Sequence, residues 1–175
     1  KQYRASETEP VAEMEALINW LPDNIPAGGE TVALVHGDYR LDNMIFHPTE
    51  PKIIGILDWE LSTLGDPLAD LAYQLMAWQF PREGGMVGLE GVDRAPLLIP
   101  SDEAYIESYC QRTGRADIDH WPFYMAFCFF RIAAILQGIK KRALIGTASS
   151  AEADSRAVMV GPLAALGAGY IKQSV

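Results

Sequence analysis

The sequence predicts an α+β domain that is mostly α-helical and contains one small β-hairpin. Several stretches repeat apolar residues every three or four positions, which is the pattern of one face of an amphipathic helix. Two short runs rich in β-branched residues, 44–46 and 53–57, flank a turn with Pro48 and Pro51, as in a hairpin. The 175 residues, 49% hydrophobic and 21% charged, are enough for a single domain with its own core.

The first expected helix follows a polar lead-in over residues 1–8. Pro10 suits a first helical turn, and the stretch 22–29, rich in Pro and Gly, should end the helix. A short apolar run at 32–35 then leads into the first conspicuous motif. The apolar stripe of this helix consists of Val11, Met14, Leu17, Ile18 and Leu21.

Four further helices are expected downstream. Ser101 is the expected N-cap of a helix to about Gln111, and Asp119 that of the longest helix. Residues 82–100, rich in Gly and Pro, form an expected long loop of the kind that serves as a lid or substrate loop. Besides the helix that Ser101 begins, the expected helices cover residues 68–76, 121–144 and about 151–172.

Charge and composition exclude several classes of function. The net charge of −9 argues against nucleic-acid binding, because phosphate backbones attract clustered Lys and Arg. The one basic cluster, 140–142, is expected to complement a helix C-terminus. Residues 121–139 are apolar, but Pro122, Arg131 and Gln137 favour a buried core helix over a membrane span.

The two cysteines, Cys110 and Cys128, belong to no metal-binding spacing. We expect both to be buried as small apolar side chains. Together with the lack of a signal-peptide pattern, they are consistent with a cytoplasmic protein.

The chemistry is concentrated between His36 and Asp70. Phosphoryl transfer to a hydroxyl needs a carboxylate at the attacking oxygen and oxygen ligands for Mg²⁺. Asp38 and Asn43, five residues apart, can supply both from one loop, and Asp58 follows the second hairpin strand. The hairpin should bring Asn43 and Asp58 together.

Between His36 and Asp70 the chain carries three linked motifs: His-Gly-Asp with Asn43, Ile-Leu-Asp-Trp-Glu, and Gly-Asp-Pro with Asp70. Together these motifs resemble the aminoglycoside phosphotransferase and choline kinase superfamily, which has a protein-kinase-like fold. Within this superfamily the motif sequences are most similar to those of the kinase-like domains found beside, or fused to, acyl-CoA dehydrogenases. The segment from Phe127 to Arg142 also resembles that subgroup. The similarity covers nearly the whole chain. The three motifs read His36-Gly37-Asp38 with Asn43, Ile56-Leu57-Asp58-Trp59-Glu60, and Gly65-Asp66-Pro67 with Asp70.

The resemblance implies a role for each motif residue. Asp38 is the catalytic carboxylate, and Asn43 and Asp58 hold Mg²⁺ for the co-substrate ATP. His36 buttresses the catalytic loop, and Asp66 and Asp70 support it from behind, Asp70 by accepting backbone hydrogen bonds. Glu60 lies near the metal region without an assigned role.

The acceptor side is less determined by the sequence. Arg40 lies within the catalytic loop and is a candidate to contact the acceptor or the transferred phosphoryl group. Arg131 lies on an apolar helix face and needs a partner. It either pairs with a carboxylate such as Asp66 or Asp70 or faces an acceptor pocket. Tyr73 and Trp78 could line that pocket, although such aromatic stripes are more often core.

The chain shows no Gly-rich phosphate cover before residue 36, and Lys1 is the only lysine before Lys52. We therefore interpret residues 1–175 as a single domain, the C-terminal catalytic lobe, without the nucleotide-clamping N-terminal lobe. The fragment alone should have little activity. Its exposed interlobe surface should be apolar and prone to homodimer formation or other self-association.

The expected function is ATP- and Mg²⁺-dependent transfer of a phosphoryl group to a hydroxyl of a small molecule. The resemblance suggests a hydroxyacyl or hydroxyacyl-CoA acceptor. Three alternatives remain open: a pseudokinase or binding module, a kinase for aminoglycosides or other antibiotics, and a metal-dependent hydrolase. The hydrolase would use His36, Asp38, His47 and Asp58.

Overall fold

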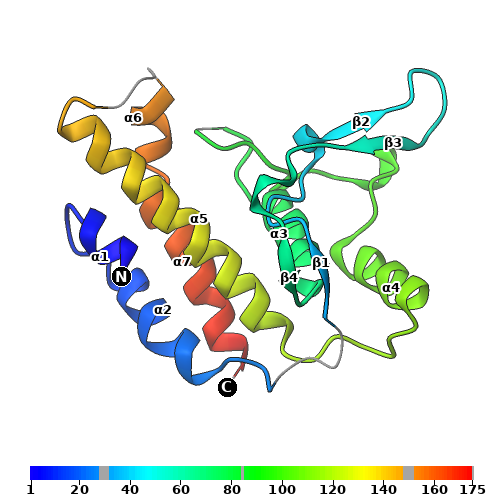
Figure 1. The fold of residues 1–175 in the computed structure, drawn as a ribbon, viewed down its shortest axis with the longest axis horizontal. Coiled ribbons are helices and arrows are strands. Elements are labelled where there is room, and N and C mark those ends of the chain that lie inside the picture. The colour runs from blue at the N-terminus through cyan, green and yellow to red at the C-terminus, as the bar shows by residue number, and fades with distance from the viewer. Residues whose placement is uncertain (28–31, 84, 148–151, 175) are drawn as a thin grey trace.

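The computed structural model describes residues 1–27, 32–83, 85–147 and 152–174. It is mostly helical, with four short strands beside the helices (Figure 1). Residues 28 and 29 of the expected helix break and residue 151 of the last expected helix lie outside the described residues. The α-helices are α1 (Gln2–Ser6), α2 (Ala12–Asp23), α3 (Leu68–Trp78), α4 (Asp102–Thr113), α5 (Trp121–Leu144), α6 (Glu152–Ala157) and α7 (Val160–Ile171).

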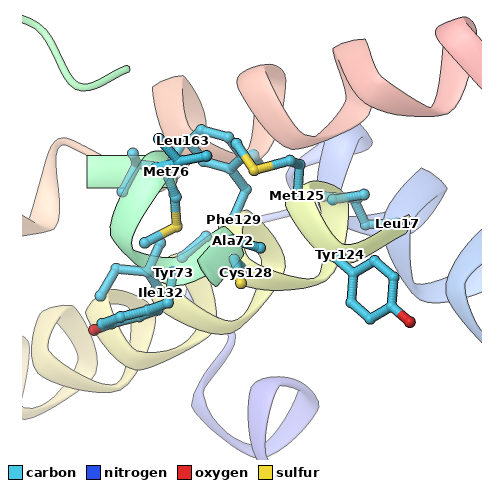
Figure 2. Close-up of a cluster of buried hydrophobic side chains, with 14 of the residues drawn as sticks. Leu17, Ala72, Tyr73, Met76, Tyr124, Met125, Cys128, Phe129, Ile132 and Leu163 are labelled. Carbon is cyan, nitrogen blue, oxygen red and sulfur yellow. The ribbon is translucent and has the colours of Figure 1, made fainter. Parts of the chain in front are cut away.

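Helix α5 is the centre of the core and packs against α1, α2, α3, α6 and α7. The predicted apolar stripe of α2 faces this core, where Met14 and Leu17 are fully buried. Gly167 of α7 lets two helices approach closely, because an added Cβ would lie 2.9 Å from Cβ of Phe129. By length and composition α5 could cross a membrane, but it carries much of this core. Figure 2 shows side chains of α2, α3, α5 and α7 meeting in one cluster.

The strands form two small antiparallel sheets. One pairs β1 (Ala33–Val35) with β4 (Thr63–Gly65), and the other pairs β2 (Met44–Phe46) with β3 (Ile53–Ile56). Strand β4 has no clear signal in the sequence. The β2–β3 ladder continues one step further, since the Leu57 amide donates to the carbonyl oxygen of Asn43 at 2.8 Å. This contact places the residue before Asp58 directly beside Asn43.

Three sequence-based boundaries were wrong. The polar lead-in contains helix α1, whose Tyr3 is buried and only 3% exposed. The last expected helix is two helices, and Pro162 lies where a proline fits the first turn of α7. The residue that precedes α5 is His120 in a left-handed conformation, and not Asp119. The Ser101 cap is confirmed, because its hydroxyl oxygen accepts from the Ala104 amide at 3.2 Å.

Within the expected long loop, residues 88–90 are anchored to the end of α3 and the residues that follow it. The amides of Gly88, Leu89 and Glu90 donate to carbonyl oxygens of Pro81, Trp78 and Phe80 at 2.9, 2.9 and 3.1 Å. A Cβ on Gly88 would lie 2.3 Å from the carbonyl oxygen of Ala77, so the loop passes too close to α3 for a side chain there.

Candidate functional site

The site is built on the loop that leaves β1, and Asp70 of α3 fixes that loop from behind. One carboxylate oxygen of Asp70 accepts from the His36 amide at 2.6 Å, and the other accepts from the Gly37 amide at 2.9 Å. These are the backbone contacts that the sequence predicted for Asp70. Gly37 has φ +84°, and an added Cβ would lie 2.7 Å from the carbonyl oxygen of Leu61. Only glycine fits there without strain.

His36 joins the two halves of the site. Its ring is 2% exposed, its Nδ1 accepts from the Asp38 amide at 3.2 Å, and its Nε2 donates to the carbonyl oxygen of Leu57 at 2.7 Å. Since one partner is a donor and the other an acceptor, the contacts select the neutral tautomer with hydrogen on Nε2. Both ring nitrogens are occupied, so His36 supports the loop and has no nitrogen left for a metal.

Asp38 and Asn43 are in direct contact. The side-chain nitrogen of Asn43, Nδ2, donates to the main-chain oxygen of Asp38 at 2.9 Å and to Oδ2 of Asp38 at 3.0 Å. Because both partners are acceptors, the orientation of the amide is determined, and its Oδ1 must face away from Asp38. Asp38 is half-buried, so its carboxylate is held in place and still reachable.

Asp58 follows immediately after the Leu57 contact with Asn43. It adopts a left-handed conformation, with φ 68° and ψ 48°, which aspartate tolerates better than most residues. Its side chain is exposed, and no described residue forms an ion pair with it. Oδ1 of Asn43 and the Asp58 carboxylate are the hard oxygen donors that Mg²⁺ prefers, and so few protein ligands suit that ion.

Asp66 has a structural position at the start of α3. Its Oδ1 accepts from the Leu68 amide at 3.0 Å, and its Oδ2 accepts from the Tyr124 hydroxyl at 2.6 Å. Burial, and then the hydrogen bond to Asp66, raise the pKa of Tyr124 above its usual value. The hydrogen bond to Tyr124 joins α3 to α5, and nothing in the sequence pattern indicated it.

Arg40 forms an ion pair with Asp42, two residues further along the same loop. Its charge also interacts with Asp38 and Tyr73. The guanidinium therefore lies within electrostatic range of the Asp38 carboxylate. Its exposed position leaves it free to exchange Asp42 for another anion.

Arg131 forms no ion pair with Asp66 or Asp70, so the first of the two sequence-based interpretations was wrong. Its Nη2 donates to the carbonyl oxygen of Gly37 at 2.7 Å, and its guanidinium carbon lies 5.4 Å from the centroid of the Tyr73 ring. Asp70 is already occupied by backbone amides. The sequence could reveal that Arg131 needs a partner, but not that the partner is a main-chain oxygen.

The charge of Asp38 acts on Tyr73 of α3, an interaction that the sequence did not predict. The ring is 8% exposed, and its hydroxyl interacts with the Asp38 carboxylate. Burial, followed by the charge of Asp38, raises the pKa of Tyr73 to about 12. Its helical spacing indicated only a core position, because the influence of Asp38 on Tyr73 arises from tertiary packing.

Trp78 lies in a different environment from Tyr73 and Arg131. Its ring packs edge-on against Tyr105, with centroids 5.1 Å apart, and under the guanidinium of Arg94, 5.2 Å away. It lines a cavity of about 290 Å³, whose other lining residues include Arg94 and Asp102. The sequence grouped Tyr73, Trp78 and Arg131 as a possible acceptor pocket. In the structure Tyr73 and Arg131 contact each other, whereas Trp78 lines this cavity.

His47, the remaining residue of the hydrolase alternative, is used in the hairpin turn. Its Nδ1 accepts from the amides of Thr49 and Glu50 at 3.4 and 3.0 Å. Within the described ranges, no three His, Cys, Asp or Glu side chains gather closely enough to bind a metal. The geometry therefore does not favour a zinc-type hydrolase site.

Comparison with protein-family models matches residues 1–126 to the phosphotransferase enzyme family. This range contains the entire loop system from His36 to Asp70 and the start of α5. It covers well over half of the chain.

Curated relatives and a solved structure agree with the family match. Acyl-CoA dehydrogenase family member 10 of Mus musculus is 50% identical over 167 residues, 95% of this chain and 16% of the mouse protein. Family member 11 of Homo sapiens is 40% identical over 168 residues, 95% of this chain and 21% of the human protein. A crystal structure of a "putative aminoglycoside phosphotransferase" from Ralstonia eutropha JMP134 is 49% identical, with a TM-score of 0.92.

The coverage of these proteins is unequal. The solved structure matches 98% of this chain but only 52% of its own. The chain spans about a fifth of the length of the curated relatives it matches. About half of the solved neighbour, and most of each curated relative, therefore lies outside the region compared.

Proposed function

The chain belongs to the phosphotransferase enzyme family, and on that premise we propose that it is the catalytic lobe of an ATP-dependent small-molecule kinase. The observation that carries the proposal is the paired Asp38 and Asn43, with Asp58 one residue beyond the Leu57–Asn43 contact. A carboxylate next to two oxygen donors is what transfer of a phosphoryl group to a hydroxyl requires.

In the proposed reaction Asp38 receives the acceptor. The acceptor hydroxyl hydrogen-bonds to the Asp38 carboxylate and gives up its proton to it. The acceptor oxygen forms a bond to the γ-phosphorus of ATP as the bond from that phosphorus to the β,γ-bridging oxygen breaks, and ADP leaves. Asn43 holds the carboxylate through its contact with Oδ2, so Asp38 does not have to reorient when the acceptor arrives.

Asn43 and Asp58 are the residues that would hold Mg²⁺, through Oδ1 of the amide and the exposed carboxylate. Bound there, the ion would neutralise charge on the nucleotide phosphates. The free oxygen of Asn43 supports this assignment, since its nitrogen is fully engaged with Asp38. Arg40, whose charge interacts with Asp38, would then contact the acceptor or the transferred phosphoryl group.

For the acceptor we propose a hydroxylated acyl compound, free or as a CoA thioester. The support is the similarity, at 50% and 40% identity, to proteins of the acyl-CoA dehydrogenase family. The aminoglycoside assignment of the solved neighbour is the specific observation for the second candidate, an antibiotic kinase. The third candidate is a pseudokinase or binding module without catalytic activity. The presence of Asp38, Asn43 and Asp58 argues against it.

We further propose that an N-terminal lobe, which clamps the nucleotide, packs on the strands of this chain. Adjacent β strands expose large apolar side chains that the described residues do not cover. Leu34 and Leu64 lie opposite each other across β1 and β4 and are 59% and 73% exposed. Such a patch marks an interaction surface. The uncompared half of the solved neighbour is long enough to supply such a lobe.

The test is phosphoryl transfer by the complete protein that carries this chain. With ATP, Mg²⁺ and a panel of hydroxyacyl-CoA thioesters, hydroxy acids and aminoglycosides, we expect transfer to a hydroxyacyl compound. Asp38→Asn should lower turnover by about 10²–10⁴-fold, as for loss of a general base. Full turnover in Asp38→Asn would show that Asp38 does not act as the base. Turnover only with aminoglycosides would favour the antibiotic kinase instead.

A further inference from the structure

One face of α5 begins against α3 and then reaches the catalytic loop. Residues three or four positions apart lie one above the other on a helix, so Tyr124, Cys128 and Arg131 share this face. Tyr124 and Cys128 hydrogen-bond through their side chains to residues at the start of α3. Arg131, further along, donates to the carbonyl oxygen of Gly37 at 2.7 Å. The face therefore meets the chain at the residue before Asp38.

Beyond Arg131 the same face is open. Ile135, one turn further, is 46% exposed. Apart from its chain neighbours and its own helix backbone, the only described atom within 4 Å of a Cβ added at Gly138 is Nη1 of Arg142, at 3.7 Å. Figure 1 shows this half of α5 running on past the strands towards α6. The surface that starts beside the catalytic loop is thus apolar and uncovered at Ile135 and Gly138.

Arg142 closes the far end of this face. It belongs to the basic cluster 140–142, which the sequence explained only as a complement to a helix C-terminus. The side chains of Lys140 and Lys141 bind the segment 5–9, through an ion pair and a main-chain oxygen. Arg142 is exposed, forms no ion pair with a described residue, and turns its guanidinium back over the open helix surface. Its charge is therefore ready for an anion at this end of the face.

The parts of this face suit the parts of one molecule. Apolar surface at Ile135 and Gly138 favours a hydrocarbon chain, because the chain gains free energy on leaving water. The planar guanidinium of Arg142 suits a phosphate, which it can bind through two parallel hydrogen bonds. With a rise of about 1.5 Å per residue, the face from Arg131 to Arg142 is about 16 Å long. The surface therefore favours an extended ligand with an anionic far end.

A hydroxyacyl-CoA thioester has these parts in the required order: a hydroxyl on the chain, a long flexible arm, and phosphates beyond the arm. An aminoglycoside does not match this surface. It is a polycation, so Arg142 would repel it, and it has no chain to lie along Ile135 and Gly138.

From this geometry we propose that the face of α5 from Arg131 to Arg142 binds the acceptor, a hydroxyacyl-CoA thioester, with its arm on Ile135 and Gly138 and a phosphate on Arg142. The inference rests on the proposed kinase function and adds the residues that select the acceptor. Arg131 stays bound to Gly37 and marks the end of the face nearest to Asp38.

The first test compares two acceptors in the complete protein that carries this chain. Arg142→Met removes the charge and keeps a long side chain. It should raise KM for a hydroxyacyl-CoA by about tenfold, the value of one hydrogen bond to a charged group, with kcat nearly unchanged. KM for the N-acetylcysteamine thioester of the same hydroxy acid, which lacks the phosphates of CoA, should not change.

Arg112→Met is the matched control, at an exposed arginine in the last turn of α4, and should leave both KM values unchanged. An equal rise of KM for the two thioesters in Arg142→Met, or no rise for either, would refute the contact between Arg142 and a phosphate.

Gly138→Leu tests the middle of the face. The new side chain would occupy the surface on which the arm should lie, so KM for the hydroxyacyl-CoA should rise by about tenfold or more. The fold should not suffer, because glycine is a poor helix former and the added atoms meet only the flexible end of Arg142. Thermal unfolding should therefore show an unchanged or higher Tm.

Gly161→Leu, at a glycine of α7 that also has open space at its Cβ, is the matched control and should leave KM unchanged. An unchanged KM in a folded Gly138→Leu variant would remove the arm from this face.

A labelling experiment does not depend on turnover, so it separates this proposal from the kinase assignment. An acyl-CoA with a photoreactive diazirine in its chain should label the tryptic peptide 132–140 of the complete protein, and excess hydroxyacyl-CoA should prevent the labelling. Absence of label from this peptide would refute the binding face even in an active kinase. Competed label there, in a protein that transfers no phosphoryl group to any acceptor, would refute the kinase function and leave the binding face standing.

Discussion

Asn43 and Asp38 form a side-chain pair in which one amide nitrogen contacts both the main-chain oxygen and Oδ2 of Asp38, at 2.9 and 3.0 Å. The pair closes the loop on itself and leaves Oδ1 of Asn43 available. One residue thus restrains the proposed base and offers a metal ligand, and the two roles use different atoms of the same amide.

Asn43→Asp should therefore damage turnover more than a surface amide change. The variant replaces a donor with a second carboxylate about 3 Å from Asp38. We expect kcat to fall by about 10–100-fold, equivalent to the loss of hydrogen bonds to a charged group. Release of ADP by the complete protein at several Mg²⁺ concentrations measures this. Asn24→Asp, at an exposed amide that donates to Trp20, is the control, and equal rates for both variants would contradict the role of Asn43.

Asp70→Ala should destabilise the fold. It leaves the His36 and Gly37 amides without their charged acceptor, which we expect to lower the free energy of unfolding by about 2–4 kcal/mol. Asp70→Asn keeps one acceptor oxygen and should lose about half as much. Urea unfolding measures both. Asp93→Ala, at an exposed carboxylate that accepts from Ala95, should change stability by less than about 0.5 kcal/mol, and a similar value for Asp70→Ala would refute the prediction.

Gly37→Ala and Gly91→Ala separate backbone strain from steric conflict. Both glycines have positive φ, +84° and +69°, but only at Gly37 does the new methyl group meet another atom, the Leu61 carbonyl oxygen at 2.7 Å. Gly91→Ala should cost about 1–2 kcal/mol from its left-handed conformation alone. Gly37→Ala should cost clearly more and displace the loop. Thermal unfolding measures the stability of the two variants. Equal losses of stability would show that Leu61 moves aside to accommodate the new methyl group.

Leu34→Ser with Leu64→Ser should reduce self-association of the 175-residue chain. The two side chains lie opposite each other on an apolar face that no described residue covers. Sedimentation velocity should show a larger monomer fraction for the double variant than for the unchanged chain. Leu98→Ser is the control, because Leu98 is 92% exposed but lies in the loop before α4. An unchanged monomer fraction in the double variant would remove this face from the interface.

Local sequence signals predicted the elements whose physical basis is itself local. The stripe from Met14 to Leu21 predicted α2, and Ser101 predicted the start of α4, because helix periodicity and capping depend only on nearby residues. Tyr3 in α1 and strand β4 were missed. The first is held by burial against α5, and the second by pairing with a strand 28 residues or more away in the chain.

By itself the sequence predicted which residues carry the chemistry. The spacing of Asp38, Asn43 and Asp58, together with the Gly65–Asp70 motif, identified the phosphotransferase resemblance that the family match confirms. The sequence could not determine which side chains contact each other across the fold. Two relationships follow from how α3 and α5 pack: Arg131 binds a main-chain oxygen, and Trp78 lines a cavity apart from it. The reason is physical: a charged or phenolic side chain specifies only that it needs a partner, and the tertiary packing decides which polar atom is within reach.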